Sequence, residues 1–425
     1  MIGASGRGRN NCRRRANGAP GCSWADAAPV RRAPLIEAIE GAGDAPAYRG
    51  LAYIVFEDLP LDGFGNAIPQ LSFEIVRPAP SAGDGPRFEE RVTGVCLIPG
   101  AGEFVYATEP VLRNMGPGRQ VAENVHVERD RANMLVSLDQ LGADFPNCDF
   151  VMLVVAWFGD DLRCGVCTIK PGVEIGAKET TPIAWRVNGI DRAHAHVVSE
   201  HDGAPAFGGT PADESVLQAI AELKARGYKV GLYPFLLMDV PAGNTLPDPY
   251  GAGAQAIYPW RGRITVHPAA GQTGTPDKSS AAAAQLAGFF GTAAAGDFGA
   301  SGGLPTYSGP VEWSYRRFVL HHAKLAALAG GVDAFVLGSE LRGVTTARDS
   351  AANYPAVAAL KTLSADVRSM LGAGVKITYA ADWSEYFGHQ PQDGSNDVFF
   401  HLDPLWSDAN IDVIGVDWYP PLSDW

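Results

Sequence analysis

The stretch that decides the fold is residues 313–340, WSYRRFVLHHAKLAALAGGVDAFVLGSE. It predicts a helix over 313–329, which ends at Gly330-Gly331, followed by a strand over 332–337. The strand is an apolar run rather than an alternation of apolar and polar residues, which is typical of a parallel sheet covered by helices. A turn of small residues then carries the carboxylate of Glu340. The stretch therefore predicts an α/β unit with an acidic side chain at the carboxyl end of its strand.

The same helix and strand unit recurs on both sides of this stretch. Further helices are expected over 134–141, from the cap at Thr210 to the stop at Gly227, over 355–371 and over 398–408. Further strands are expected over 149–157, 183–187, 229–238, 375–380 and 411–416. Such repeats build either a closed barrel or an open doubly wound sheet. A barrel is favoured, because no glycine-rich phosphate loop follows any strand and because acids and aromatics gather after the strands.

The strand count leaves a question about closure of this barrel. With 332–337, six strands are expected, whereas a closed barrel of this kind has about eight. Either the last two strands are missing from this chain, or the count is wrong near 183–200. The stretch 241–310 is too long for a simple connection and is expected to form an elaborated loop over the rim. An incomplete barrel would expose strand edges, so self-association of the isolated chain is expected.

The part before residue 129 differs from the barrel pattern. Residues 1–34 carry seven arginines and one acid, and are expected to be a disordered basic arm or a truncated domain edge, with a tether to an anionic surface as the minor alternative. Residues 35–128 are expected to form a small β-rich segment, with strands at 52–56 and 70–76. Residues 129–425 are expected to form the barrel-like domain.

Composition excludes several classes of protein. The 425 residues are 46% hydrophobic and carry a net charge of −13, which allows a large core and disfavours a general nucleic-acid binder. The longest apolar run, 150–158, is too short for a membrane span, and no apolar stretch follows the basic arm as a secretory signal requires. Six cysteines form no disulfide framework, and Cys164-Gly-Val-Cys167 is a weak metal signal. Structural thiols or a local disulfide with Cys148 are favoured over zinc, and no cofactor is expected.

The candidate site lies at the carboxyl ends of the strands. Glu340 is the first candidate for catalysis, as the acid/base of glycoside hydrolysis, because its apolar surroundings can raise a carboxyl pKa. Aromatic side chains nearby suit the apolar faces of pyranose rings. The substrate-binding candidates are Trp157, Asp160, Tyr233, Asp239, Ser339, Asp382, Trp383, Glu385, Asp417, Trp418 and Tyr419.

Structural roles are weighed beside these functional ones. Glu340 can instead cap a turn or pair with Arg342 or Arg348. Asp382 and Glu385 either orient a substrate or brace their loop, and Asp417 either faces a ligand or belongs to a turn. The pair His321-His322 is expected to serve packing and surface rather than a metal. For Arg261 and Arg263, solvated loop positions are favoured over contacts with an acidic sugar.

Several long motifs resemble one family, the tail-tip or host-specificity proteins of gene transfer agents and related siphophage-like prophages. The motifs are LIEAIEGAG (35–43), AYRGLAY (47–53), PGAGEFVY (99–106), VVAWFGDDLR (154–163), YPWRGRIT (258–265), GSELR (338–342) and YAADWSEY (379–386). The resemblance runs from about residue 35 to 425. It implies a tail-hub β segment followed by a TIM-barrel-like domain similar to glycoside hydrolases.

The resemblance also implies roles for residues. In the similar hydrolase clan, which is of the retaining type, the acid/base glutamate follows the fourth strand, as Glu340 does in our count. The clan's nucleophile follows a seventh strand, so no residue of this chain receives that role. Ser339 stands where the clan has asparagine, which weakens the case for sugar contacts. The resemblance leaves activity undecided, and we expect no turnover by the isolated chain.

Three hypotheses for function follow. The first is a tail-tip component whose barrel binds or cleaves a bacterial envelope glycan. The second is a non-catalytic structural or receptor-binding barrel, and the third is a free-standing glycosidase, which the lack of a signal peptide disfavours. The first implies a virion location after cytoplasmic synthesis, with other tail or baseplate proteins and cell-wall polysaccharide as partners, and an oligomer set by tail-tip symmetry.

Overall fold

The computed structural model describes residues 86–98, 100–391 and 393–419, and the strand residues 2–3, 21–25, 53–57 and 75–76. The chain divides into two compact units, Met1–Arg91 and Val92–Trp425. In the first unit, β1 (Ile2–Gly3) pairs with β4 (Ile75–Val76), and β2 (Gly21–Ala25) pairs with β3 (Tyr53–Glu57). The unit ends with the short helix α2 (Phe88–Arg91). Of the two strands expected here, β3 matches 52–56, and only the last residues of 70–76 lie within the described part.

The second unit is built on a parallel sheet whose strands follow one another in chain order. The six parallel strands are β5 (Gly94–Leu97), β8 (Phe150–Gly159), β17 (Lys229–Met238), β20 (Ala334–Ser339), β21 (Lys376–Asp382) and β22 (Gly415–Asp417). A short strand, β9 (Ile169–Lys170), pairs antiparallel with the end of β8. The register is continuous between β8 and β17, from Phe150 opposite Lys229 to Gly159 opposite Met238.

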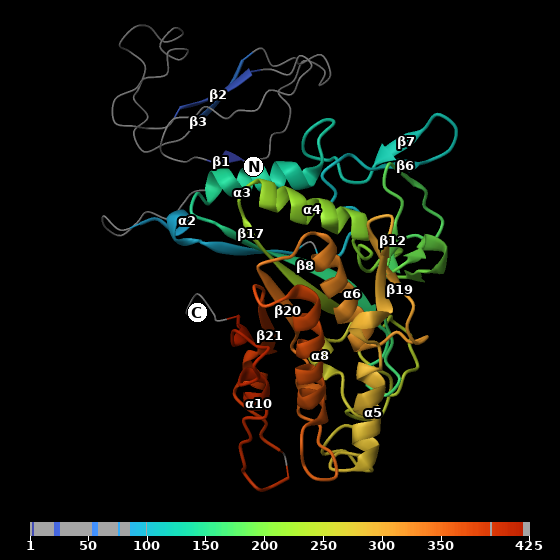
Figure 1. The fold of residues 1–425 in the computed structure, drawn as a ribbon. Helices are drawn as coiled ribbons and strands as arrows, with labels where there is room; N and C mark the ends of the chain where they lie inside the picture. The colour runs from blue at the N-terminus through green and yellow to red at the C-terminus, as the bar shows by residue number, and fades with distance from the viewer. Residues whose placement is uncertain are drawn as a thin grey trace. The chain divides into compact units, whose positions relative to one another are not determined.

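A helix lies between each pair of consecutive strands. These helices are α3 (Asn133–Asp144), α4 (Asp213–Ala225), α6 (Tyr315–Leu328), α8 (Pro355–Leu371) and the single turn α10 (Asp403–Trp406). Figure 1 shows them following one another in the colour order of the chain, and α6 contacts both α4 and α8. Parallel strands in chain order with helical crossovers are the topology of a TIM-barrel-like fold. The expected fold class is therefore confirmed, and residues 393–419 bring it to its sixth parallel strand.

The remaining elements decorate the connections. The hairpin and bridge strands are β6 (Leu112–Asn114), β7 (Gln120–Ala122), β10 (Gly172–Val173), β11 (Thr180–Thr181), β12 (Arg186–Val187), β13 (Ile190–Asp191), β14 (His196–Val197), β15 (Glu200–His201) and β16 (Ala204–Pro205). The long connection after β17 contains η3 (Arg261–Arg263), α5 (Ser280–Phe290), η4 (Ala295–Asp297), β18 (Phe298–Ser301) and β19 (Leu304–Tyr307). The short helices η2 (Arg192–His194), α7 (Arg342–Thr345) and α9 (Trp383–Tyr386) complete the fold. The elaborated loop expected over 241–310 is confirmed.

One expected strand is wrong. Residues 183–187 do not join the sheet, and their last two residues form β12, which pairs only with β13. The apolar residues of this stretch, Ile183, Trp185 and Val187, are buried, so the alternation reflects burial of side chains and not pairing in the sheet. The first strand of the sheet is instead β5, so the total of six stands and Glu340 still follows the fourth strand. Because β5 belongs to the sheet, residues 94–97 are not part of a separate β segment, while the tail-hub interpretation of 35–128 stays a prediction.

The core has two parts. The larger part lies between the sheet and the helices and includes Leu153, Val155, Leu232 and Phe335. The smaller part lies on the opposite face of the strands, where Val154, Tyr233, Val336 and Ala380 pack together. No described helix has both the length and the apolar character that a membrane crossing requires.

Several sequence expectations about single residues are settled by this packing. Trp157 is fully buried in the larger core against Trp313 and Phe318, so it is not a sugar-stacking residue at the rim. His321 and His322 are also buried there, which confirms packing but corrects the expected surface position. The cysteines Cys96, Cys148, Cys164 and Cys167 are free thiols, so the local disulfide is not formed.

Candidate functional site

The turn after β20 places Glu340 at the carboxyl end of the sheet. Gly338 has a φ of +143°, and a Cβ there would lie 1.5 Å from the hydroxyl oxygen of Tyr315, so only glycine fits. The Tyr315 hydroxyl donates to the carbonyl of Leu337 at 2.9 Å and fixes the end of the strand. Glu340 itself has a φ of +52°, and its backbone N–H donates to Ala380 O of β21 at 3.0 Å. These contacts keep the turn in its strained backbone conformation, and the turn in turn fixes the position of the Glu340 carboxylate.

Glu340 is buried and contacts two nitrogen donors. Trp260 Nε1–H donates to Glu340 Oε2, and Arg261 Nη2 lies 3.1 Å from the same oxygen. Both donors come from the long connection after β17, which folds back over the ends of the strands. Arg342 and Arg348, the structural partners considered for Glu340, make no such contact, since Arg348 pairs with Asp277.

Asp417, at the end of β22, is the second carboxyl group of this cluster. The Tyr233 hydroxyl donates to Asp417 Oδ2 at 2.7 Å, and Arg261 Nη2 lies 3.8 Å from that oxygen. Burial raises the pKa of Asp417 to about 6, while the hydrogen bond from Tyr233 lowers it and the negative charge of Glu340 raises it. Burial also raises the pKa of Tyr233, as does the charge of Asp417. Glu340, which is buried, and Asp417, whose side chain is 19% exposed, therefore form a carboxyl pair.

Arg261 is the cation of this pair. Its guanidinium lies over the ring of Phe235, 3.9 Å from the centroid, and donates to the carbonyl and the hydroxyl of Ser339 at 3.0 and 2.8 Å. The side chain is buried, so the expected solvated loop position is wrong. Arg261 thus holds Ser339 and lies within 4 Å of both carboxyl groups, which makes it a positioning residue for the pair. Arg263, in contrast, is half exposed over Tyr250.

Asp382 and Glu385 form a second acidic group, with a structural role. Asp382 caps α9 by accepting from the backbone of Ser384 at 3.0 Å, and Glu385 completes the capping box. Glu385 is fully buried, where it accepts from Thr345 at 2.5 Å and from Tyr379 at 2.9 Å. Burial raises the pKa of Glu385 to about 7, although the hydrogen bonds from Thr345 and Tyr379 lower it. Of the two roles left open for these acids, the structure supports bracing of the loop.

The acids after β8 and β17 also hold loops. Asp160 accepts from the backbone N–H of Thr168 at 2.7 Å. Asp239 accepts from His196 Nε2 at 2.7 Å and from the Ser199 hydroxyl at 2.5 Å. Burial alone would raise the pKa of Asp239, but the hydrogen bonds from His196 and Ser199 hold it below its ordinary value. Asp239 is therefore an ionised anchor for this loop, and His196 is the more exposed member of the cluster.

Exposed aromatic side chains follow the last two strands. Trp383 is 51% exposed, Trp418 68% and Tyr419 80%. Burial of its hydroxyl raises the pKa of Tyr419, and the next contributors are the charges of Asp417 and Glu340. Tyr419 therefore lies within electrostatic range of the carboxyl pair. A ligand can reach these three rings, and also Trp260, which is 38% exposed.

The carboxyl ends of β17, β20 and β22 thus bring together a carboxyl pair, its arginine and exposed aromatics. Comparison with known proteins finds one family model that matches part of the chain. Residues 313–425 match the GTA TIM-barrel-like domain. This span of the GTA TIM-barrel-like domain contains Glu340, Asp382 and Asp417, whereas Tyr233 and Arg261 lie before it. No protein of curated function matches the sequence.

Solved structures similar to the chain include GH113 β-mannanases. Two structures of a GH113 β-1,4-mannanase, one of them a complex, are 17% identical, with TM-scores of 0.32 and 0.33. AaManA from Alicyclobacillus acidocaldarius, in complex with ManMIm, is 15% identical with a TM-score of 0.35. The alignments cover 69–77% of this chain and 57–60% of those chains, so the chain spans less than two thirds of their length.

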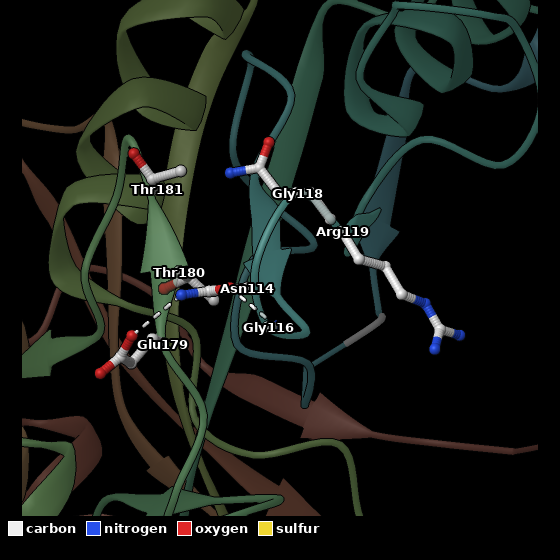
Figure 2. A pocket seen from close by; sticks show the side chains of 8 residues that line it. Asn114, Gly116, Gly118, Arg119, Glu179, Thr180 and Thr181 are labelled. Carbon is white, nitrogen blue, oxygen red and sulfur yellow. Dashed lines mark hydrogen bonds between the residues drawn. The ribbon is translucent and has the colours of Figure 1, made fainter.

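Two further polar features lie outside the GTA TIM-barrel-like span. Glu103, Glu123 and Glu174 are the acids in the described part of the chain that gather closely enough for a metal, but Lys178 Nζ already lies 2.8–3.1 Å from all three. A groove of about 440 Å³ is lined by residues of the β6–β7 hairpin and of β11, and Figure 2 shows the hydrogen bond between two of its lining residues, Asn114 and Glu179. None of its lining residues belongs to the carboxyl pair or its aromatic neighbours.

Sequence reasoning missed Trp260, Arg261 and His196 as contacts of the predicted acids. The motif YPWRGRIT contains the first two, but its partners lie about 80 residues away in the chain, so no local spacing links them. Tyr233 was expected to bind substrate; its hydroxyl donates to Asp417, and the binding role stays a prediction.

Proposed function

We propose that this chain is a tail-tip or host-specificity component of a gene transfer agent or related phage-like particle, and that its barrel-like unit binds a bacterial envelope glycan. The observation that carries the proposal is the pair of Glu340 and Asp417, with Tyr419 within electrostatic range of both and Trp418 exposed after the same strand as Asp417. Carboxyl groups bond to sugar hydroxyls, and aromatic rings pack against the apolar faces of pyranoses. The match of residues 313–425 to the GTA TIM-barrel-like domain supports the particle as the setting.

Binding is proposed rather than cleavage because of the contacts that Glu340 makes. Its Oε2 accepts from Trp260 and pairs with Arg261, so this oxygen already has partners inside the chain, whereas a glycosidase acid must reach the leaving oxygen of the sugar. The partners in this proposal are other tail or baseplate proteins and the cell-wall or surface polysaccharide.

The experiment is sedimentation of the chain with purified bacterial cell-wall polysaccharide. Truncating both exposed aromatics, Trp418→Ala with Tyr419→Ala, is expected to weaken binding about tenfold, since each exposed ring contributes on the order of 0.5–1.5 kcal/mol. Arg119→Ala, which alters the polar groove of Figure 2, is the matched control and should leave binding unchanged. Equal binding of the aromatic variant and the parent chain would contradict the proposal.

A non-catalytic structural barrel is the second candidate. This candidate is favoured because Arg261 and Trp260 of the same chain already contact the Glu340 carboxylate. It predicts no sedimentation with any envelope polysaccharide, and assembly into tail particles that survives both Glu340→Gln and the aromatic substitutions.

A further inference from the structure

We propose that Asp417 is the proton-bearing member of the carboxyl pair, and that it donates a hydrogen bond to an acceptor oxygen of the bound glycan. The ligand class is a sugar that presents a ring, glycosidic or carboxylate oxygen to the site. This inference rests on the proposed function, because it assigns the group that recognises the glycan.

The two carboxyl groups are contacted by different hydrogen-bond donors. Glu340 Oε2 contacts the indole N–H of Trp260 and the guanidinium of Arg261 at 3.1 Å. Asp417 lies farther from the same guanidinium, 3.8 Å, and its close donor is the neutral hydroxyl of Tyr233 at 2.7 Å. Charge-assisted donors favour the ionised form of the group they contact more closely. The negative charge is therefore placed on Glu340.

The charge that surrounds Asp417 also bears on its protonation. The groups that face it are Tyr233 from β17, Arg261 from η3, Glu340 after β20, Cys96 from β5 and Tyr419 after its own strand. Arg261 is the cation among these described neighbours, and it is shared with Glu340. Two nearby carboxyl groups with one cation between them do not both ionise readily, so one proton is retained.

The pKa of Asp417 agrees with this geometry. Burial and the neighbouring charge of Glu340 bring it to about 6, so the carboxyl group is largely neutral at pH 5 and largely ionised at pH 7.5. A neutral carboxylic acid held in an apolar site acts as a hydrogen-bond donor. An ionised one accepts only and repels an acceptor oxygen.

The direct test reads the two carboxyl groups without any glycan. The chain is labelled with ¹³C at the side-chain carboxyl carbons, and its NMR spectra are recorded from pH 4.5 to 8.5. Asp417→Asn and Glu340→Gln assign the two signals by loss. The expected result is a titration of the Asp417 signal near pH 6. An Asp417 signal already ionised at pH 5, or a Glu340 signal that titrates in its place, would overturn the assignment.

The second test measures binding to purified cell-wall polysaccharide at pH 5 and pH 7.5. The parent chain is expected to bind about tenfold more weakly at pH 7.5, since one hydrogen bond to the ligand is lost. Asp417→Asn, whose amide donates at both pH values, should bind equally at both, and Asp417→Ala should bind weakly at both. Asp144→Asn, at an exposed position on α3, is the control and should keep the parent's pH dependence.

The two tests distinguish failure of the donor role of Asp417 from failure of the proposed function. Binding that does not change with pH in the parent chain overturns the donor role of Asp417. Absence of binding at both pH values, with the expected NMR titration, refutes the proposed function and leaves the protonation assignment supported.

Discussion

Replacing Glu385 by glutamine should change how the stability of the barrel-like unit depends on pH. The Glu385 side chain is fully buried, accepts hydrogen bonds from Thr345 and Tyr379, and has a pKa raised from 4.5 to about 7, chiefly by burial. A raised carboxyl pKa means that the folded chain binds the proton more tightly than the unfolded chain. Stability is therefore highest at low pH and falls as the pH rises between the two pKa values.

The magnitude follows from the pKa difference. One pKa unit corresponds to about 1.4 kcal/mol, so the raised pKa of Glu385 costs about 3 kcal/mol of unfolding free energy once the pH exceeds 7. Glutamine fills the same space and does not ionise, but it loses one acceptor, at a cost of about 1 kcal/mol. The two stabilities should thus cross near pH 5, where ionisation of the unfolded chain already costs the parent about 1 kcal/mol, and the variant should be about 2 kcal/mol more stable at pH 8.

Urea denaturation followed by far-UV circular dichroism at pH 5, 6.5 and 8 measures this crossing. Glu214→Gln, an exposed acid in the first turn of α4, is the control and should keep the parent's dependence on pH. Parallel stability profiles for the parent chain and Glu385→Gln would refute the reasoning, because Glu385 would then be ionised at no cost in the folded chain.

Three further substitutions test the core and the site. Gly338→Ala should destabilise the unit by about 3 kcal/mol or more in urea denaturation, because the new Cβ meets the Tyr315 hydroxyl. Adding Tyr315→Phe to the same chain should recover part of this stability. An unchanged stability of Gly338→Ala would contradict the turn geometry. Arg261→Met should cost about 3–5 kcal/mol and lower the melting temperature, since it leaves two buried carboxyl groups without a cation, whereas an unchanged melting temperature would argue against the buried pair. Trp157→Ala should lower the free energy of unfolding by about 3–5 kcal/mol in the same denaturation assay and leave the glycan affinity of the folded fraction unchanged. Loss of glycan affinity without loss of stability would indicate that Trp157 contacts the glycan.

The sequence predicted the strands that are long apolar runs. Residues 229–238 were expected as a strand and form β17, because a strand covered on both faces needs apolar residues throughout. Strand β5 was missed, since its four residues, GVCL, are only partly buried and give no run. Residues 183–187 gave a false strand prediction, because their apolar side chains are buried in the larger core although the segment does not pair with the sheet.

The sequence predicted individual residues of the candidate site but not which of them contact one another. The position of Glu340 after a buried strand could be read locally, and so could the acids after the other strands. The link between Glu340 and Asp417 could not, because it depends on Arg261, which the long connection after β17 brings back over the sheet. Likewise, the capping role of Asp382 and the anchoring role of Asp239 depend on contacts that only the folded chain shows.

The measurement that tests the central claim most directly is a crystal structure of the chain soaked at pH 5 with an oligosaccharide released from bacterial cell wall. The account predicts a sugar ring against Trp418 or Tyr419, with one of its oxygens within hydrogen-bond distance of Asp417. A sugar bound instead in the polar groove beside Asn114 and Glu179, with the carboxyl pair untouched, would contradict the account.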